Sequence, residues 1–121
     1  MTIQVLIVDD KAKVRQDLRT LLDLCVDIEI VGEAANGQEA VQQVEELEPE
    51  VVLLDLEMPV LDGYEAARQI KSRFPNSRII ALTVHGYDEA KQKAFEAGVD
   101  SFFVKGAAAD LLIQEILDRK G

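Results

Sequence analysis

Four apolar runs in this chain each end in a polar or charged side chain that can take part in chemistry. The runs and their ends are residues 3–8 before Asp9 and Asp10, residues 51–54 before Asp55, residues 79–82 before Thr83, and residues 102–104 before Lys105. If the runs are parallel strands of one sheet, these side chains meet at the carboxyl edge, where open α/β sheets bind ligands. Three carboxylates, a hydroxyl and an ammonium suit a divalent cation and a phosphoryl group.

Strand-like and helix-like stretches alternate along the chain. Val14, Leu18, Leu21 and Leu22 recur at the spacing of a helix face after the first run. Residues 28–34 form a further apolar stretch, which Glu29 and Glu33 interrupt, and a charged strand belongs at a sheet edge. Five βα units of this kind predict an α/β domain with a doubly wound, parallel, five-stranded sheet in the order 2-1-3-4-5. The run at 51–54 is expected to be central and buried on both faces.

Composition sets limits on the class of protein. The 121 residues suffice for one domain, and the formal charge of −10 argues against direct nucleic-acid binding by this domain. Cys25 is the only cysteine, so neither an internal disulfide nor a cysteine metal cage can form. No apolar run approaches the ~18 residues of a membrane span. We therefore expect a cytoplasmic domain that does not contact a membrane.

The strand ends predict a phosphoryl-transfer site. Two carboxylates about 4 Å apart repel each other by about 4 kcal/mol at an effective dielectric constant of about 20, and Mg²⁺ would relieve this repulsion because it binds carboxylate oxygens. Asp55, on the central strand, is the expected nucleophile. Each residue also has a structural interpretation: Asp10 as a helix cap, Asp55 as a turn residue, Thr83 as a plain strand end and Lys105 as a solvated charge. Their joint placement favours the functional interpretation.

In this order and spacing, the motifs resemble the receiver domain of two-component response regulators over the whole chain, residues 1–121. The matching stretches are Asp9-Asp10, Asp55-Leu56-Glu57-Met58-Pro59 with Asp62-Gly63, Leu82-Thr83, and Phe102-Phe103-Val104-Lys105. The resemblance implies a flavodoxin-like (βα)5 fold and a phosphoacceptor function. The donor would be a sensor histidine kinase or a phosphotransfer protein, and the domain would be no enzyme beyond its own phosphorylation and dephosphorylation.

The resemblance also implies a role for each site residue. Asp55 would accept the phosphoryl group, and Mg²⁺ would be bound by Asp10, Asp55 and the backbone carbonyl of Glu57, with Asp9 acting through water. Lys105 and Thr83 would bind the phosphoryl group. Thr83 and the aromatic Phe102 would form the switch, changing the face made by the fourth helix, fifth strand and fifth helix.

Four positions bear on how this chain differs from its relatives. Val84 is bulkier than the residue common after the switch threonine, and it predicts slow dephosphorylation. The side chain of Glu57 is expected to face solvent, and an effect on metal or phosphate binding is the alternative. His85, the only histidine, is expected to be a loop residue at the rim of the pocket, and pH-sensitive modulation of phosphate loss is the alternative. Gly106 replaces the proline that often follows the lysine. With residues 82–85, this glycine resembles receivers attached to helix-turn-helix DNA-binding domains, which indicates transcription regulation.

Two other functions remain open from the sequence. A pseudo-receiver would keep the fold and act as an interaction module without phosphorylation. A Mg²⁺-dependent phosphatase with an aspartyl nucleophile would use Asp55 and the acid two residues later, Glu57. Homodimerisation is a further expectation. The sequence is compatible both with a single-domain shuttle and with a receiver cut from a transcription factor, and it identifies neither the cognate kinase nor the signal.

Overall fold

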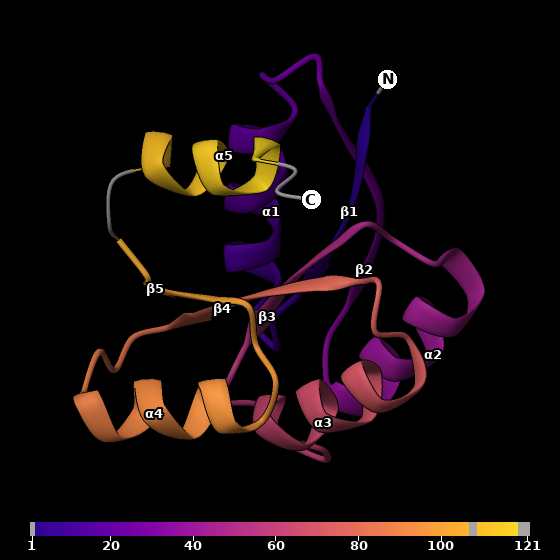
Figure 1. The fold of residues 1–121 in the computed structure, drawn as a ribbon. Helices are drawn as coiled ribbons and strands as arrows, with labels where there is room; N and C mark the ends of the chain where they lie inside the picture. The colour runs from indigo at the N-terminus through magenta and orange to yellow at the C-terminus, as the bar shows by residue number, and fades with distance from the viewer. Residues whose placement is uncertain (1, 107–108, 119–121) are drawn as a thin grey trace.

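The computed structural model describes residues 2–106 and 109–118, so part of the predicted domain, at 1, 107–108 and 119–121, lies outside the described residues. Five strands alternate with five helices, and all strand pairs are parallel, in the order β2-β1-β3-β4-β5 (Figure 1). The elements are β1 (Ile3–Val8), α1 (Ala12–Leu22), β2 (Ile28–Ala34), α2 (Gly37–Leu47), β3 (Val51–Asp55), α3 (Gly63–Arg73), β4 (Arg78–Thr83), α4 (Asp88–Glu96), β5 (Ser101–Val104) and α5 (Ala109–Leu117). The predicted fold class and strand order are confirmed.

Helices cover both faces of the sheet (Figure 1). Side chains of a strand alternate between faces, so Val52 and Leu54 of β3 pack toward α2 and α3, whereas Val51 and Leu53 pack toward α1 and α5. All five residues of β3 are buried, including Asp55 at its end. The two apolar layers cover both faces of the central strand, and its polar side chain, that of Asp55, lies at the carboxyl end of the strand.

The charged strand β2 lies at the edge, as predicted, but one of its two acids is paired. Glu29 is exposed, whereas Glu33 accepts hydrogen bonds from Arg15 Nε at 3.0 Å and Arg19 Nε at 2.8 Å. The register with β1 shifts between Val5 and Leu6, as in a β-bulge. Glu33 therefore joins the edge strand to α1 and does not only protect a free edge.

The start of α3 is built against the end of β3. Asp62 caps the helix by accepting a hydrogen bond from the Glu65 N–H at 2.9 Å. Gly63 follows it, and a Cβ atom on Gly63 would collide with the carbonyl oxygen of Asp55. Only a glycine lets the helix approach the backbone of Asp55 this closely.

No helix in the described ranges is long and apolar enough to cross a membrane.

Arg78, at the start of β4, binds the end of α5. Its guanidinium donates to the carbonyl oxygens of Glu115, Ile116 and Asp118 at 3.0, 2.6 and 3.0 Å. The last carbonyl groups of a helix have no partner within the helix and carry partial negative charge. A guanidinium with several donors in one plane is suited to bind them together.

We therefore expect Arg78→Ala to lower the free energy of unfolding by about 2 kcal/mol, because hydrogen bonds to a charged group are worth about 1.5–3 kcal/mol. Arg78→Lys should restore only part of this stability. The matched control is Arg68→Ala, which removes an exposed ion pair with Glu65 and should cost less than about 1 kcal/mol. Urea unfolding measures both changes, and equal losses in the two alanine variants would contradict the role given to Arg78.

Candidate functional site

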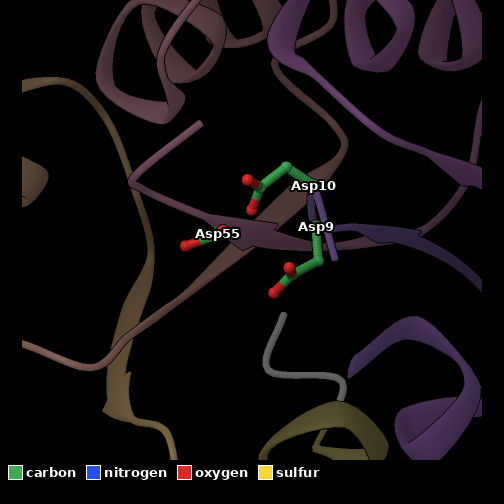
Figure 2. A group of neighbouring side chains, drawn as sticks. All are labelled: Asp9, Asp10 and Asp55. Atoms are coloured by element: carbon green, nitrogen blue, oxygen red, sulfur yellow. The ribbon is translucent and has the colours of Figure 1, made fainter. Parts of the chain in front are cut away.

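Three aspartates meet at the carboxyl edge of the sheet. Asp9 and Asp10 follow β1, and Asp55 ends the neighbouring strand β3. Each offers a carboxylate oxygen, and these oxygens lie within 4.8 Å of one another (Figure 2). Asp9 and Asp55 are buried, while Asp10 is half-buried. So much negative charge in a small volume requires a compensating cation.

Lys105, directly after β5, supplies one positive charge. Its Nζ lies 2.7 Å from Asp9 Oδ2 and 3.4 Å from Asp55 Oδ1. Burial alone would lower the pKa of Lys105, but the hydrogen bond to Asp9 and the two nearby carboxylates raise its pKa above the ordinary value. Lys105 is therefore charged at neutral pH and holds both buried aspartates.

The backbone also contributes to the arrangement of Asp9. Its Oδ1 accepts a hydrogen bond from the Lys11 N–H at 2.9 Å, and its carbonyl oxygen accepts one from Arg15 Nη1 at 2.7 Å. The helix N-cap is Lys11, without a side-chain cap, which excludes the interpretation of Asp10 as a helix cap. Asp9 is thus fixed by three donors, counting Lys105.

Asp55 has one satisfied oxygen and one that is free. Oδ1 accepts a hydrogen bond from the Glu57 N–H at 3.1 Å. This contact fits the structural interpretation of Asp55 as a turn residue, but it involves only Oδ1. Oδ2 is buried and has no hydrogen-bond partner among the described residues. Burial raises the pKa of Asp55 from 3.8 to about 6, the charge of Asp9 also raises it, and the Glu57 N–H and Lys105 oppose the shift.

A second carboxylate oxygen at this site is also unsatisfied. Asp10 Oδ1 is buried without a hydrogen-bond partner in the described part of the chain, and Lys11 Nζ lies 3.6 Å away, beyond hydrogen-bond distance. Buried polar atoms without partners are rare and require an explanation, such as an ion. Two such oxygens, from Asp10 and Asp55, in one acidic pocket are the ligand type that Mg²⁺ prefers. The residues present therefore fit the cation expected from the sequence.

Thr83 lies beside this pocket, and its hydroxyl is engaged. Thr83 Oγ1 donates to Glu57 Oε1 at 3.1 Å and accepts from the His85 N–H at 3.2 Å. Glu57 was expected to face solvent, and its side chain is half exposed, but the carboxylate binds Thr83 and lies 3.3 Å from His85 Nε2. His85 itself is exposed at the rim and stacks on Tyr87.

The remaining predicted site residues surround the strand ends. Phe102 is half-buried against the apolar layer on the α2–α4 face, whereas Phe103 packs on the opposite face. Val84 is exposed beside Thr83. Gly106 has φ +89°, a left-handed backbone that favours glycine, and no cis peptide bond occurs within residues 2–106 or 109–118. The roles of these residues, and of the Glu57 carbonyl, stay predictions.

Sequence reasoning missed two contacts of the site. Arg15, which holds the Asp9 carbonyl, is itself held by Glu33 of β2. The pairing of Ile7 with Glu33 places this acid next to β1, but the register shift between Val5 and Leu6 cannot be found from the sequence pattern. The hydrogen bond between Glu57 and Thr83 joins residues 26 positions apart and leaves no periodic signal.

Known proteins have a similar sequence and a similar fold. The response regulator protein VraR of Staphylococcus aureus is 43% identical over 109 residues, which cover 90% of this chain and 52% of VraR. The receiver domain of the putative response regulator NarL from Mycobacterium tuberculosis has a TM-score of 0.92 at 26% identity, covering 97% of this chain and 94% of that one. A DNA-binding response regulator of the LuxR family from Staphylococcus aureus has a TM-score of 0.86 at 30% identity, covering 94% of this chain and 98% of that one.

The chain spans about half the length of the curated relatives it matches. Residues 5–117 match the family model of the response regulator receiver domain, which is nearly the whole chain. The match includes Asp9, Asp10, Asp55, Thr83 and Lys105. This chain therefore belongs to the response regulator receiver domain family.

Proposed function

We propose that this receiver domain accepts a phosphoryl group on Asp55, in a Mg²⁺-dependent reaction, from the phosphohistidine of a sensor histidine kinase or a phosphotransfer protein. The observation that carries the proposal is the buried Oδ2 of Asp55, which has no hydrogen-bond partner among the described residues. The Asp55 carboxylate offers an oxygen within 4.8 Å of oxygens of Asp9 and Asp10, and Lys105 Nζ lies 3.4 Å from Asp55 Oδ1. An oxygen without a hydrogen bond keeps its lone pairs available for attack. The chemistry is limited to the phosphorylation and dephosphorylation of this domain.

The metal would be held by a carboxylate oxygen of Asp10, by the Asp55 oxygen that does not attack phosphorus and by the carbonyl of Glu57, with Asp9 acting through water. The unpartnered Asp10 Oδ1 supports this assignment, whereas Lys105 already occupies Asp9 Oδ2. When bound, Mg²⁺ supplies positive charge that offsets the carboxylates and the phosphoryl oxygens. Asp55 would thereby lose its proton at a lower pH than in the metal-free protein.

In the transfer step, Asp55 Oδ2 forms a bond to phosphorus as the bond between phosphorus and the donor imidazole nitrogen breaks. The electron pair of that bond stays on the imidazole, and Asp55 becomes an acyl phosphate. Lys105 then binds a phosphoryl oxygen while remaining near Asp9. Thr83 donates a hydrogen bond from its hydroxyl to another phosphoryl oxygen, and the ring of Phe102 turns inward as Thr83 moves.

The output of this switch is proposed from the relatives. The new charge on Asp55 biases a two-state equilibrium in the face formed by α4, β5 and α5. VraR is a response regulator and the LuxR-family relative is described as DNA-binding, which supports transcription regulation by a longer protein. Because its formal charge is −10, this domain would not contact DNA itself. It would act in the cytoplasm through a partner, an output domain or a homodimer.

The test uses phosphoramidate, whose phosphorus–nitrogen bond resembles that of phosphohistidine. The chain, with Mg²⁺, is expected to gain the mass of one phosphoryl group, and neither Asp55→Asn nor the chain with EDTA should gain it. A chain that binds Mg²⁺ and gains no mass from phosphoramidate or acetyl phosphate would be a pseudo-receiver. Repeated turnover of a small phosphate ester would instead indicate the phosphatase.

Val84 is expected to slow the loss of the phosphoryl group. It lies directly after Thr83 with an exposed β-branched side chain. We expect this side chain to narrow the approach of water to the acyl phosphate. Val84→Ala should shorten the half-life of phosphorylated Asp55 by about threefold, equivalent to about 0.65 kcal/mol in the barrier. Intact-mass time courses after removal of the donor measure the half-life, and equal half-lives would contradict this role.

A further inference from the structure

The hydroxyl of Thr83 is already committed in the unphosphorylated protein. A threonine hydroxyl has one proton to donate, and that proton is directed to Glu57 Oε1 at 3.1 Å. The oxygen also accepts the His85 N–H at 3.2 Å. Thr83 is buried, so no bulk water competes for the hydroxyl. A phosphoryl oxygen on Asp55 can accept a hydrogen bond from this hydroxyl only if the hydrogen bond to Glu57 breaks.

Glu57 is connected to both ends of the switch. Its backbone N–H donates to Asp55 Oδ1 at 3.1 Å, and its carboxylate binds Thr83. The second carboxylate oxygen lies 3.3 Å from His85 Nε2, and the His85 ring stacks on Tyr87 with centroids 5.5 Å apart. Because half of the Glu57 side chain is exposed, these contacts hold the carboxylate in place, and burial does not.

We propose that Glu57 is a positioning residue that holds the Thr83 hydroxyl in the unphosphorylated arrangement and competes with the phosphoryl group for it. The inference rests on the proposed function, in which Thr83 donates to the phosphoryl group. The competition lowers the affinity of the site for a phosphoryl group by the strength of the Thr83–Glu57 hydrogen bond. Removal of Glu57 therefore favours the activated state through Thr83.

A charge effect must be separated from this competition. The Glu57 carboxylate would repel an anionic phosphoryl group whatever Thr83 does. Repulsion of this kind persists when the Thr83 hydroxyl is removed, whereas competition for the hydroxyl does not. A double-mutant cycle of Glu57 and Thr83 distinguishes the two, because it isolates the part of each effect that depends on the other residue.

The experiment measures the affinity for beryllofluoride, a phosphoryl analogue, at saturating Mg²⁺ by calorimetry. Four proteins are compared: the wild type, Glu57→Ala, Thr83→Ala and the double variant. With Thr83 present, Glu57→Ala should tighten binding by about tenfold, since the lost bond is partly exposed and lies at the weak end of hydrogen bonds to charged groups. In the Thr83→Ala background, the gain should fall below about twofold.

Two further variants serve as matched controls. Glu57→Asp keeps the charge but is one methylene shorter and loses its reach to Thr83, so it should tighten binding as Glu57→Ala does. Glu57→Gln removes the charge and keeps an acceptor oxygen, so its affinity should stay nearer to that of the wild type. The Mg²⁺ affinity of every variant is measured separately, so that a change in metal binding is not mistaken for a change in beryllofluoride binding.

The outcomes separate the inference from the proposed function. Equal tightening in both backgrounds would overturn the role of Glu57 and leave Asp55 as phosphoacceptor. Beryllofluoride affinities that depend on the charge of the side chain at position 57, and not on whether that side chain reaches Thr83, would have the same meaning. If beryllofluoride binds no variant while Mg²⁺ binds, the proposed function fails and the competition fails with it. A cycle with the predicted coupling supports both.

Discussion

Lys105→Met is expected to lower the free energy of unfolding of the metal-free protein by about 3 kcal/mol at about pH 8, because it leaves buried charge without a partner. Lys105 Nζ lies 2.7 Å from Asp9 Oδ2, and Asp9 is 1% exposed. Methionine fills a similar volume, so the loss is mainly electrostatic. The pKa of Lys105 is raised in the folded protein. The contribution of Lys105 to stability is therefore complete at pH values below its unfolded-state pKa, and it is lost only as the pH rises through its folded-state pKa.

The measurement is urea unfolding in EDTA and again at saturating Mg²⁺. The metal should restore part of the stability of Lys105→Met, because it supplies the charge that the lysine supplied. Lys91→Met is the matched control, since Lys91 is exposed on α4. A loss no larger than that of Lys91→Met would show that Lys105 does not balance the aspartates.

Asp55→Asn should have the opposite effect and raise the free energy of unfolding of the metal-free protein by about 2–3 kcal/mol at about pH 8. The pKa of Asp55 is raised from 3.8 to about 6, and burial is the main cause. Between these values the folded protein binds a proton that the unfolded chain does not, so stability falls as the pH rises through this window. Above it, ionised Asp55 destabilises the fold.

The pH dependence gives the sharper test. The gain from Asp55→Asn should vanish below about pH 3, where Asp55 is protonated in both states, and should reach a plateau above about pH 7. Asp27→Asn, at an exposed loop position before β2, changes the net charge equally and should show no such rise. A gain that does not vary with pH would contradict a raised pKa at Asp55.

Together, these variants describe a pocket that is assembled at the expense of stability. Asp9 is bound by Lys105, Lys11 and Arg15, whereas Asp10 and Asp55 each retain a buried oxygen without a hydrogen-bond partner among the described residues. A site optimised only for folding would not keep such atoms. The unsatisfied oxygens are therefore the part of the site that a cation and a phosphoryl group would complete.

Much of this arrangement follows from simple patterns. The uninterrupted run at 51–54 correctly predicted a buried central strand, and the acids at 29 and 33 correctly predicted an edge strand. With right-handed crossovers, the strand order follows, and it brings Asp9, Asp10 and Asp55 together because parallel strands end at the same edge.

Contacts between loops could not be predicted in the same way. Glu57 is polar and follows a buried strand, which is also typical of a solvent-facing residue. The paired ends of β3 and β4 bring Thr83 near it, and the path of the loop after β4 brings His85 to it. The pairing of Glu33 with Arg15 depends on a register shift of one residue between β1 and β2. Such contacts depend on three-dimensional placement and not on periodicity.

The central claim is that Asp55 is the phosphoacceptor, and locating the phosphoryl group tests it most directly. After phosphorylation with acetyl phosphate and Mg²⁺, borohydride reduces an aspartyl phosphate to homoserine, which peptide mass mapping assigns to one position. The account predicts homoserine at position 55 and unmodified Asp9 and Asp10. Homoserine at either of those two positions, or at none, would contradict it.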